Sequence, residues 1–111
     1  MKLEKIVQVV NAVLLLTHSL GGEDFHVDIE KGQADYLFTL RTQITELPEE
    51  KLKELSDCLS IDRQREIEPY WRIDYDSKNP VEPSLLGMML DEAKVDYDGR
   101  ELVITGRRKD A

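Results

Sequence analysis

The stretch "AKVDYDGRELVITGR", residues 93–107, carries the clearest structural signal in the chain. Apolar and polar residues alternate on both sides of Asp98-Gly99, a dipeptide favoured in the two-residue turn of a β-hairpin. The cross-strand pairs predicted from this turn are Tyr97 with Arg100, Val95 with Leu102, and Ala93 with Ile104. Such pairing gives the hairpin one mostly apolar face. We therefore predict an antiparallel hairpin here.

A second hairpin is predicted upstream. Residues 24–30, "DFHVDIE", alternate cleanly and direct Phe25, Val27 and Ile29 to one face. The segment "KGQ" then provides a turn, and residues 34–44, "ADYLFTLRTQI", alternate again. Two alternating runs separated by a glycine-containing turn are typical of an antiparallel hairpin.

Residues 2–20 have the pattern of an amphipathic helix that ends at Gly21-Gly22. Its apolar arc covers roughly 220° of the helical wheel, which is wider than the ~100° stripe of a one-sided surface helix. An arc this wide favours apolar contacts on two sides. We expect one side to pack on the sheet and the other on a second subunit, with Val9 and Leu16 as partner-binding residues.

Two further helices are predicted, at residues 46–60 and 84–93. In the first, Pro48 suits the helix start, and Leu52, Leu55 and Leu59 form a buried stripe. The second, "SLLGMMLDEA", is apolar almost all round, which favours a buried position.

The stretch "EPYWRIDYD", residues 68–76, permits two interpretations. After Pro69 a strand is favoured over a helix, and it would turn Trp71 inward and leave Tyr70 and Arg72 outside. Aromatic residues beside arginine are also enriched at binding hot spots. A place for Trp71 in the core is favoured, and the alternative is that Tyr70, Trp71 and Arg72 are partner-binding residues.

Together these elements predict one α+β domain spanning residues 1–111. It comprises an N-terminal helix, an antiparallel sheet of four to five strands that includes two hairpins, and two further helices on one face.

Charge and composition exclude several classes of function. With 15 basic and 23 acidic side chains the net charge is −8, which disfavours nucleic-acid binding. The one basic cluster, residues 107–109, is expected to be a frayed, solvated end. A single cysteine excludes an intramolecular disulfide and fits a reducing compartment. No apolar run reaches the ~18 residues of a membrane span, and the N-terminus lacks the features of a signal peptide, so we expect a cytoplasmic protein.

Catalytic and metal-binding patterns are weak. Asp24, His26, Asp28 and Glu30 line one strand face at spacings that suit a metal, but a solvated strand face has the same pattern. Cys58 lies near the buried stripe of its helix, where a thiol is usually a small hydrophobe. No nucleotide-binding, hydrolase or zinc-protease motif occurs. We therefore predict no catalytic residue, metal or cofactor.

The leading functional hypothesis is a small protein–protein interaction module that forms a homodimer. One alternative is an acidic inhibitor, antitoxin-like or immunity-like protein that captures a basic partner, because residues 46–82 contain 11 acidic and 6 basic side chains. Another alternative is a small enzyme or metal-binding protein that uses the face from Asp24 to Glu30.

Overall fold

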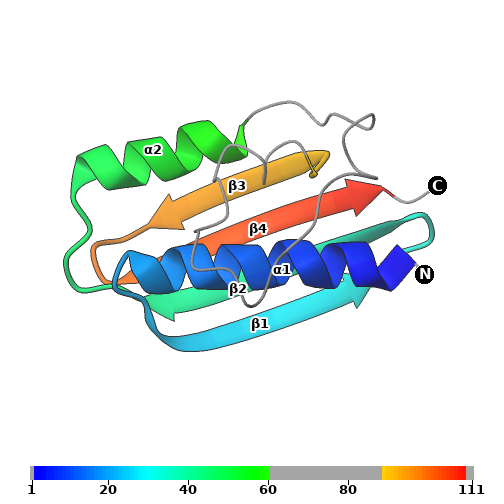
Figure 1. The fold of residues 1–111 in the computed structure, drawn as a ribbon, viewed down its shortest axis with the longest axis horizontal. Coiled ribbons are helices and arrows are strands. Elements are labelled where there is room, and N and C mark those ends of the chain that lie inside the picture. The colour runs from blue at the N-terminus through cyan, green and yellow to red at the C-terminus, as the bar shows by residue number, and fades with distance from the viewer. Residues whose placement is uncertain (1, 61–88, 110–111) are drawn as a thin grey trace.

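The computed structural model describes residues 2–60 and 89–109, which form two helices and four strands (Figure 1). In chain order they are α1 (Lys2–Ser19), β1 (Glu23–Lys31), β2 (Asp35–Gln43), α2 (Glu49–Leu59), β3 (Glu92–Tyr97) and β4 (Glu101–Lys109). The strands form one antiparallel sheet in the order β1-β2-β4-β3. The predicted α+β class and both hairpins are confirmed. The strand predicted at 71–75 and the first part of the helix predicted at 84–93 lie outside the described residues.

Helix α1 ends at the two glycines, as predicted. Gly21 adopts a φ of 98°, which L side chains rarely tolerate. Its N–H donates to the carbonyl of His18 at 3.0 Å, and the N–H of Gly22 donates to the carbonyl of Thr17 at 2.9 Å. This pair of bonds is a Schellman motif. It reverses the chain, so that β1 runs back along α1 in the opposite direction (Figure 1).

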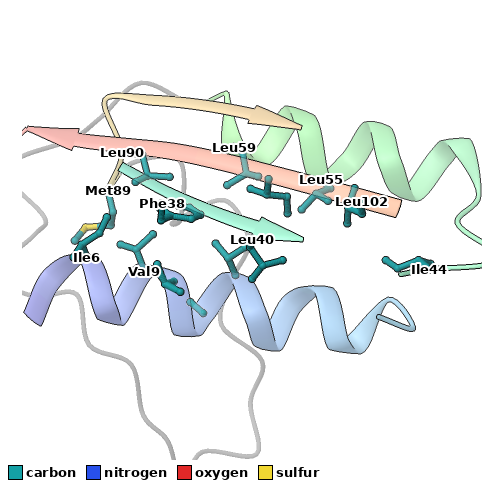
Figure 2. Close-up of a cluster of buried hydrophobic side chains, with 14 residues drawn as sticks. Ile6, Val9, Phe38, Leu40, Ile44, Leu55, Leu59, Met89, Leu90 and Leu102 are labelled. Carbon is teal, nitrogen blue, oxygen red and sulfur yellow. The ribbon is translucent and has the colours of Figure 1, made fainter. Parts of the chain in front are cut away.

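One face of the sheet is buried, and both helices contribute to that core (Figure 2). Phe38 and Leu40 of β2 and Leu102 and Ile104 of β4 are fully buried there. The remaining buried apolar residues are Ile6, Val9, Val10, Ala12, Val13, Ile44, Leu55, Leu59, Met89 and Leu90. The alternation predicted for β2 and the leucine stripe predicted for α2 are therefore confirmed.

The hairpin of β3 and β4 has the predicted faces but a different register. Its pairs are Tyr97 with Leu102, Val95 with Ile104, and Ala93 with Gly106. The central turn residues are thus Gly99, with a φ of 97°, and Arg100. The side chain of Asp98 explains the shift, because one of its oxygens accepts hydrogen bonds from the N–H groups of Arg100 (2.9 Å) and Glu101 (2.7 Å).

The prediction of a helix at 84–93 is wrong for residues 89–93. Residues 89–91 form a turn and irregular backbone, and β3 begins at Glu92. The N–H of Asp91 donates to the carbonyl of Arg107 at 2.8 Å, so pairing with β4 replaces helical bonds. Met89 and Leu90 are 0% and 2% exposed, which shows that their apolar character serves the core without a helix.

The prediction that residues 107–109 form a frayed end is also wrong. They complete β4, which lies between β2 and β3 and therefore pairs on both sides. Arg108 points into the core at 3% exposure, and its Nη1 donates to the carbonyl of Met89 at 2.9 Å. Arg107 forms ion pairs with Glu92 and, at 3.8 Å, with Asp35.

Candidate functional site

Among the strands that the structure describes, β1 lies at an edge of the sheet, and its apolar side chains are only partly covered. Val27 pairs with Leu40, and Ile29 pairs with Phe38, so all four side chains lie on the face of the sheet that carries the helices. Phe38 and Leu40 are 0% exposed, whereas Val27 and Ile29 are each 39% exposed. The core layer is thus complete over β2 and incomplete over β1.

Helix α1 extends this exposed apolar surface. The rings of His18 and Phe25 lie 6.3 Å apart, which shows that the His18 side of α1 faces β1. Val7 lies 11 residues earlier, which at 100° per residue returns it to the same side of the helix. Val7 is 42% exposed. We refer to Val7, Val27 and Ile29 together as the β1 flank.

The opposite face of β1 is charged. His26, Asp28 and Glu30 alternate with Val27 and Ile29 and are exposed. Asp24 does not continue this row, because a bulge between Glu23 and His26 gives it a φ of 56°. Within residues 2–60 and 89–109, no three His, Cys, Asp or Glu side chains are placed to share a metal ion.

A small groove separates the end of α1 from α2. It has a volume of about 80 Å³ and an apolar floor of Leu16, Leu20, Leu55 and Cys58. At its rim Lys51 and Glu54 form an exposed ion pair at 3.6 Å. Burial raises the pKa of the Cys58 thiol, and the neighbouring Asp57 and Glu54 carboxylates raise it further. The thiol is therefore protonated at neutral pH, which disfavours a nucleophilic role.

The face of the sheet away from the core also has a hollow, of about 460 Å³, which Leu37, Lys94 and Thr105 help to line. Arg107 at its border is neutralised by Asp35 and Glu92. A guanidinium already paired with two carboxylates is a poor anion site. Leu37, at 39% exposure, is the large apolar side chain exposed on this face among the described residues.

The five partner-binding residues predicted from the sequence fall in three places. Val9 is completely buried in the core, which explains its apolar character without a partner. Leu16 lies in the groove between α1 and α2 and is partly buried. Tyr70, Trp71 and Arg72 lie outside the described residues. The structure thus does not bring Val9 and Leu16 together on one exposed surface.

Nothing in the sequence marks Val27 and Ile29 as surface residues. Their alternation predicted correctly which way they point. The missing signal was strand order, because β1 and β2 have similar patterns and only the order β1-β2-β4-β3 shows that β1 lies at the edge.

Comparison with known proteins yields no relative of this chain. No protein-family model, curated protein sequence or solved structure matches it. Neither of the helices in residues 2–60 and 89–109 combines the length and apolar character needed to cross a lipid bilayer.

Proposed function

We propose that this chain is a protein-interaction module that associates with itself through the β1 flank. The single observation that carries the proposal is the difference in burial between paired strands. Val27 and Ile29 are 39% exposed although their partners Leu40 and Phe38 are 0% exposed. A second copy packed on the β1 flank would extend the core layer over β1.

The free energy available from the flank alone is modest. Full burial of a valine or isoleucine side chain is worth roughly 1.5–3 kcal/mol. Covering the remaining two-fifths of each flank residue on both copies therefore recovers roughly 4–7 kcal/mol in total. Association costs an estimated 4–15 kcal/mol in lost freedom. A stable dimer consequently needs further interactions beside the flank.

The test compares two substitutions that are matched in exposure. Ile29→Glu introduces a charge into the β1 flank, and Leu37→Glu introduces the same charge at equal exposure on the opposite face. In analytical ultracentrifugation the wild type and Leu37→Glu are expected to have twice the 12.8 kDa mass of one chain, and Ile29→Glu that of one chain. A wild-type protein that stays monomeric up to millimolar concentration would contradict the proposal.

Leu16→Glu distinguishes association through the groove between α1 and α2 from association through the β1 flank. If the groove between α1 and α2 carried the association, this substitution would produce the monomer and Ile29→Glu would not. We expect Leu16→Glu to remain dimeric, because Leu16 lies on the side of α1 that faces α2.

A further inference from the structure

The edge of β1 gives the proposed self-association a defined geometry, and we infer that two copies pair β1 with β1 in antiparallel orientation, centred on Val27. This inference rests on the proposed function and names the partner strand and its register. The additional interactions that the flank requires would then come from backbone hydrogen bonds between the two edges.

Strand β1 is suited to such pairing. It has nine residues, and within residues 2–60 and 89–109 only β2 pairs with it, on one of its two sides. Eight of its residues are exposed, and Phe25 is partly buried. The bulge at its start ends before His26, so the pairing with β2 is regular from His26 to Lys31. A regular edge of this length presents a row of unpaired N–H and C=O groups to a second strand.

Symmetry limits the possible registers. A two-fold axis perpendicular to the sheet places the helix-bearing faces of both copies on the same side. Directly opposite residues in an antiparallel pair lie on the same face of the sheet. The axis must therefore pass midway between the two copies of one residue, so that this residue faces its own equivalent. The candidates near the middle of β1 are His26, Val27, Asp28 and Ile29.

Charge selects among these four centres. Pairing about Val27 places His26 opposite Asp28 of the second copy, and does so twice in the dimer. Pairing about Asp28 brings the two Asp28 carboxylates together, and pairing about Ile29 places Asp28 opposite Glu30. Pairing about His26 places the two His26 side chains opposite each other and leaves Asp28 opposite the bulge at Asp24, without a basic partner. Like charges directly opposite each other destabilise a strand pair.

The Val27 register places like charges opposite each other at Asp24 and Glu30, which also occurs twice in the dimer. This pairing falls at the bulge, where the φ of 56° at Asp24 breaks the regular alternation. On the helix-bearing face the same register places Val27 against Val27 and Phe25 against Ile29. Each of these contacts is apolar, so this register pairs apolar residues on one face and, near its centre on the other face, places an imidazole and not a second carboxylate opposite Asp28.

Disulfide trapping tests the register directly. In a Cys58→Ala background, Val27→Cys places two cysteines directly opposite each other, within the ~4.4–6.8 Å between Cα atoms that a disulfide requires. Ile29→Cys is the control, because Ile29 has the same 39% exposure. In the proposed register the two Ile29 residues are four positions apart, roughly 13–14 Å along the strands. We expect Val27→Cys to form a covalent dimer on mild oxidation at least tenfold faster than Ile29→Cys.

Charge substitutions test the same register without a cross-link. His26→Glu places a carboxylate opposite Asp28 and is expected to raise the dimer dissociation constant about tenfold, since two such pairs occur per dimer. Adding Asp28→Lys to that variant places a lysine opposite the new glutamate and is expected to recover a dissociation constant at least as low as that of the wild type. A double variant no tighter than His26→Glu alone overturns the register.

The remaining outcomes separate the inference from the proposed function. A wild-type monomer overturns both. A dimer that cross-links through Asp28→Cys or Ile29→Cys and not through Val27→Cys overturns the register. A dimer that no cysteine on β1 can trap, and that Ile29→Glu leaves intact, overturns the pairing of β1 and directs attention to the opposite face of the sheet.

Discussion

Gly106 lies in close contact with the ring of Phe38, and Gly106→Ala tests directly how the core is packed. Gly106 lies on β4 directly opposite Phe38 on β2. A Cβ atom at position 106 would lie 2.7 Å from Cζ of Phe38 and 3.1 Å from Cδ1 of Leu90. Ordinary carbon contacts are about 3.5–4.0 Å, so the Phe38 ring must move by about 1 Å.

The destabilisation expected for Gly106→Ala depends on whether the Phe38 ring can move away from the added methyl group. Phe38 is 0% exposed and Leu90 is 2% exposed, so neither can move into solvent. Overpacking a core of this kind costs about 1–3 kcal/mol. Taking ~2 kcal/mol, and ~2.1 cal/mol/K of unfolding entropy per residue for 111 residues, Tm should fall by about 9 °C. Without a clash, Gly→Ala in a strand would stabilise by about 0.4–1 kcal/mol, so the sign of the effect is diagnostic.

A double-mutant cycle, followed by urea denaturation, measures the coupling free energy between position 106 and Phe38. The four proteins are the wild type, Gly106→Ala, Phe38→Leu and the double variant. Leucine lacks the ring atoms that approach position 106, so the alanine methyl group should cost little in the double variant. We expect a favourable coupling free energy of about 1–2 kcal/mol between the two substitutions. A Gly106→Ala protein as stable as the wild type, or strictly additive effects, would refute the packing described for Phe38.

Four smaller predictions concern individual side chains. Thr42→Val should lower the free energy of unfolding by about 1 kcal/mol, because its buried hydroxyl donates to the carbonyl of Glu23 at 2.8 Å across the bulge. Thr17→Val should change it by less than about 0.5 kcal/mol in the same urea assay, since that hydroxyl bonds only to its own helix. Hydrogen bonds from the backbone of Glu101 and Arg100 lower the pKa of Asp98 in the folded protein. The Asp98 carboxylate therefore stabilises the fold above the ordinary aspartate pKa, and this stabilisation is lost as the pH falls through the pKa of Asp98 in the folded state. The difference in Tm between wild type and Asp98→Asn should therefore vanish between about pH 5 and pH 2, and a constant difference would contradict this. Because its pKa is raised, Cys58 should react with iodoacetamide at neutral pH more slowly than glutathione does, as followed by mass spectrometry.

The alternation of the strands could be read from the sequence because it depends only on a period of two. Val95 and Tyr97 point to the core whether the hairpin pairs as predicted or slips by two residues. The two-residue shift of the hairpin register could not be predicted from the alternation, because the Asp98 side chain fixes the turn by accepting hydrogen bonds from the N–H groups of Arg100 and Glu101. A pattern with period two is unchanged by a shift of two residues.

The order of the strands was not predictable in the same way, and the functional surface depends on it. Arg108 was expected in a solvated end, but β4 is central and buries it. The alternation predicted the face to which Val27 points but not its burial, and Val27 is 39% exposed whereas its partner Leu40 is 0% exposed. Arg108 is buried because β2 pairs with β4 and not with β3, which makes β4 an inner strand. Val27 stays exposed because, among the described strands, only β2 pairs with β1.

The two edges of the sheet differ in a way that bears on how far self-association could extend. Strand β1 is nine residues long and its apolar side chains are partly exposed, whereas β3 has six residues and α2 packs against it (Figure 1). The exposed side chains of β3 include Lys94, paired with Asp96 at 3.5 Å, and lysine on an edge strand discourages further pairing. Pairing through β1 alone uses the same surface on both copies and is complete after one contact. Pairing of β1 with β3 would leave one edge of each kind open and could continue into a filament. The shorter, charged and helix-supported edge at β3 disfavours that route, so association through β1 is expected to stop at the dimer.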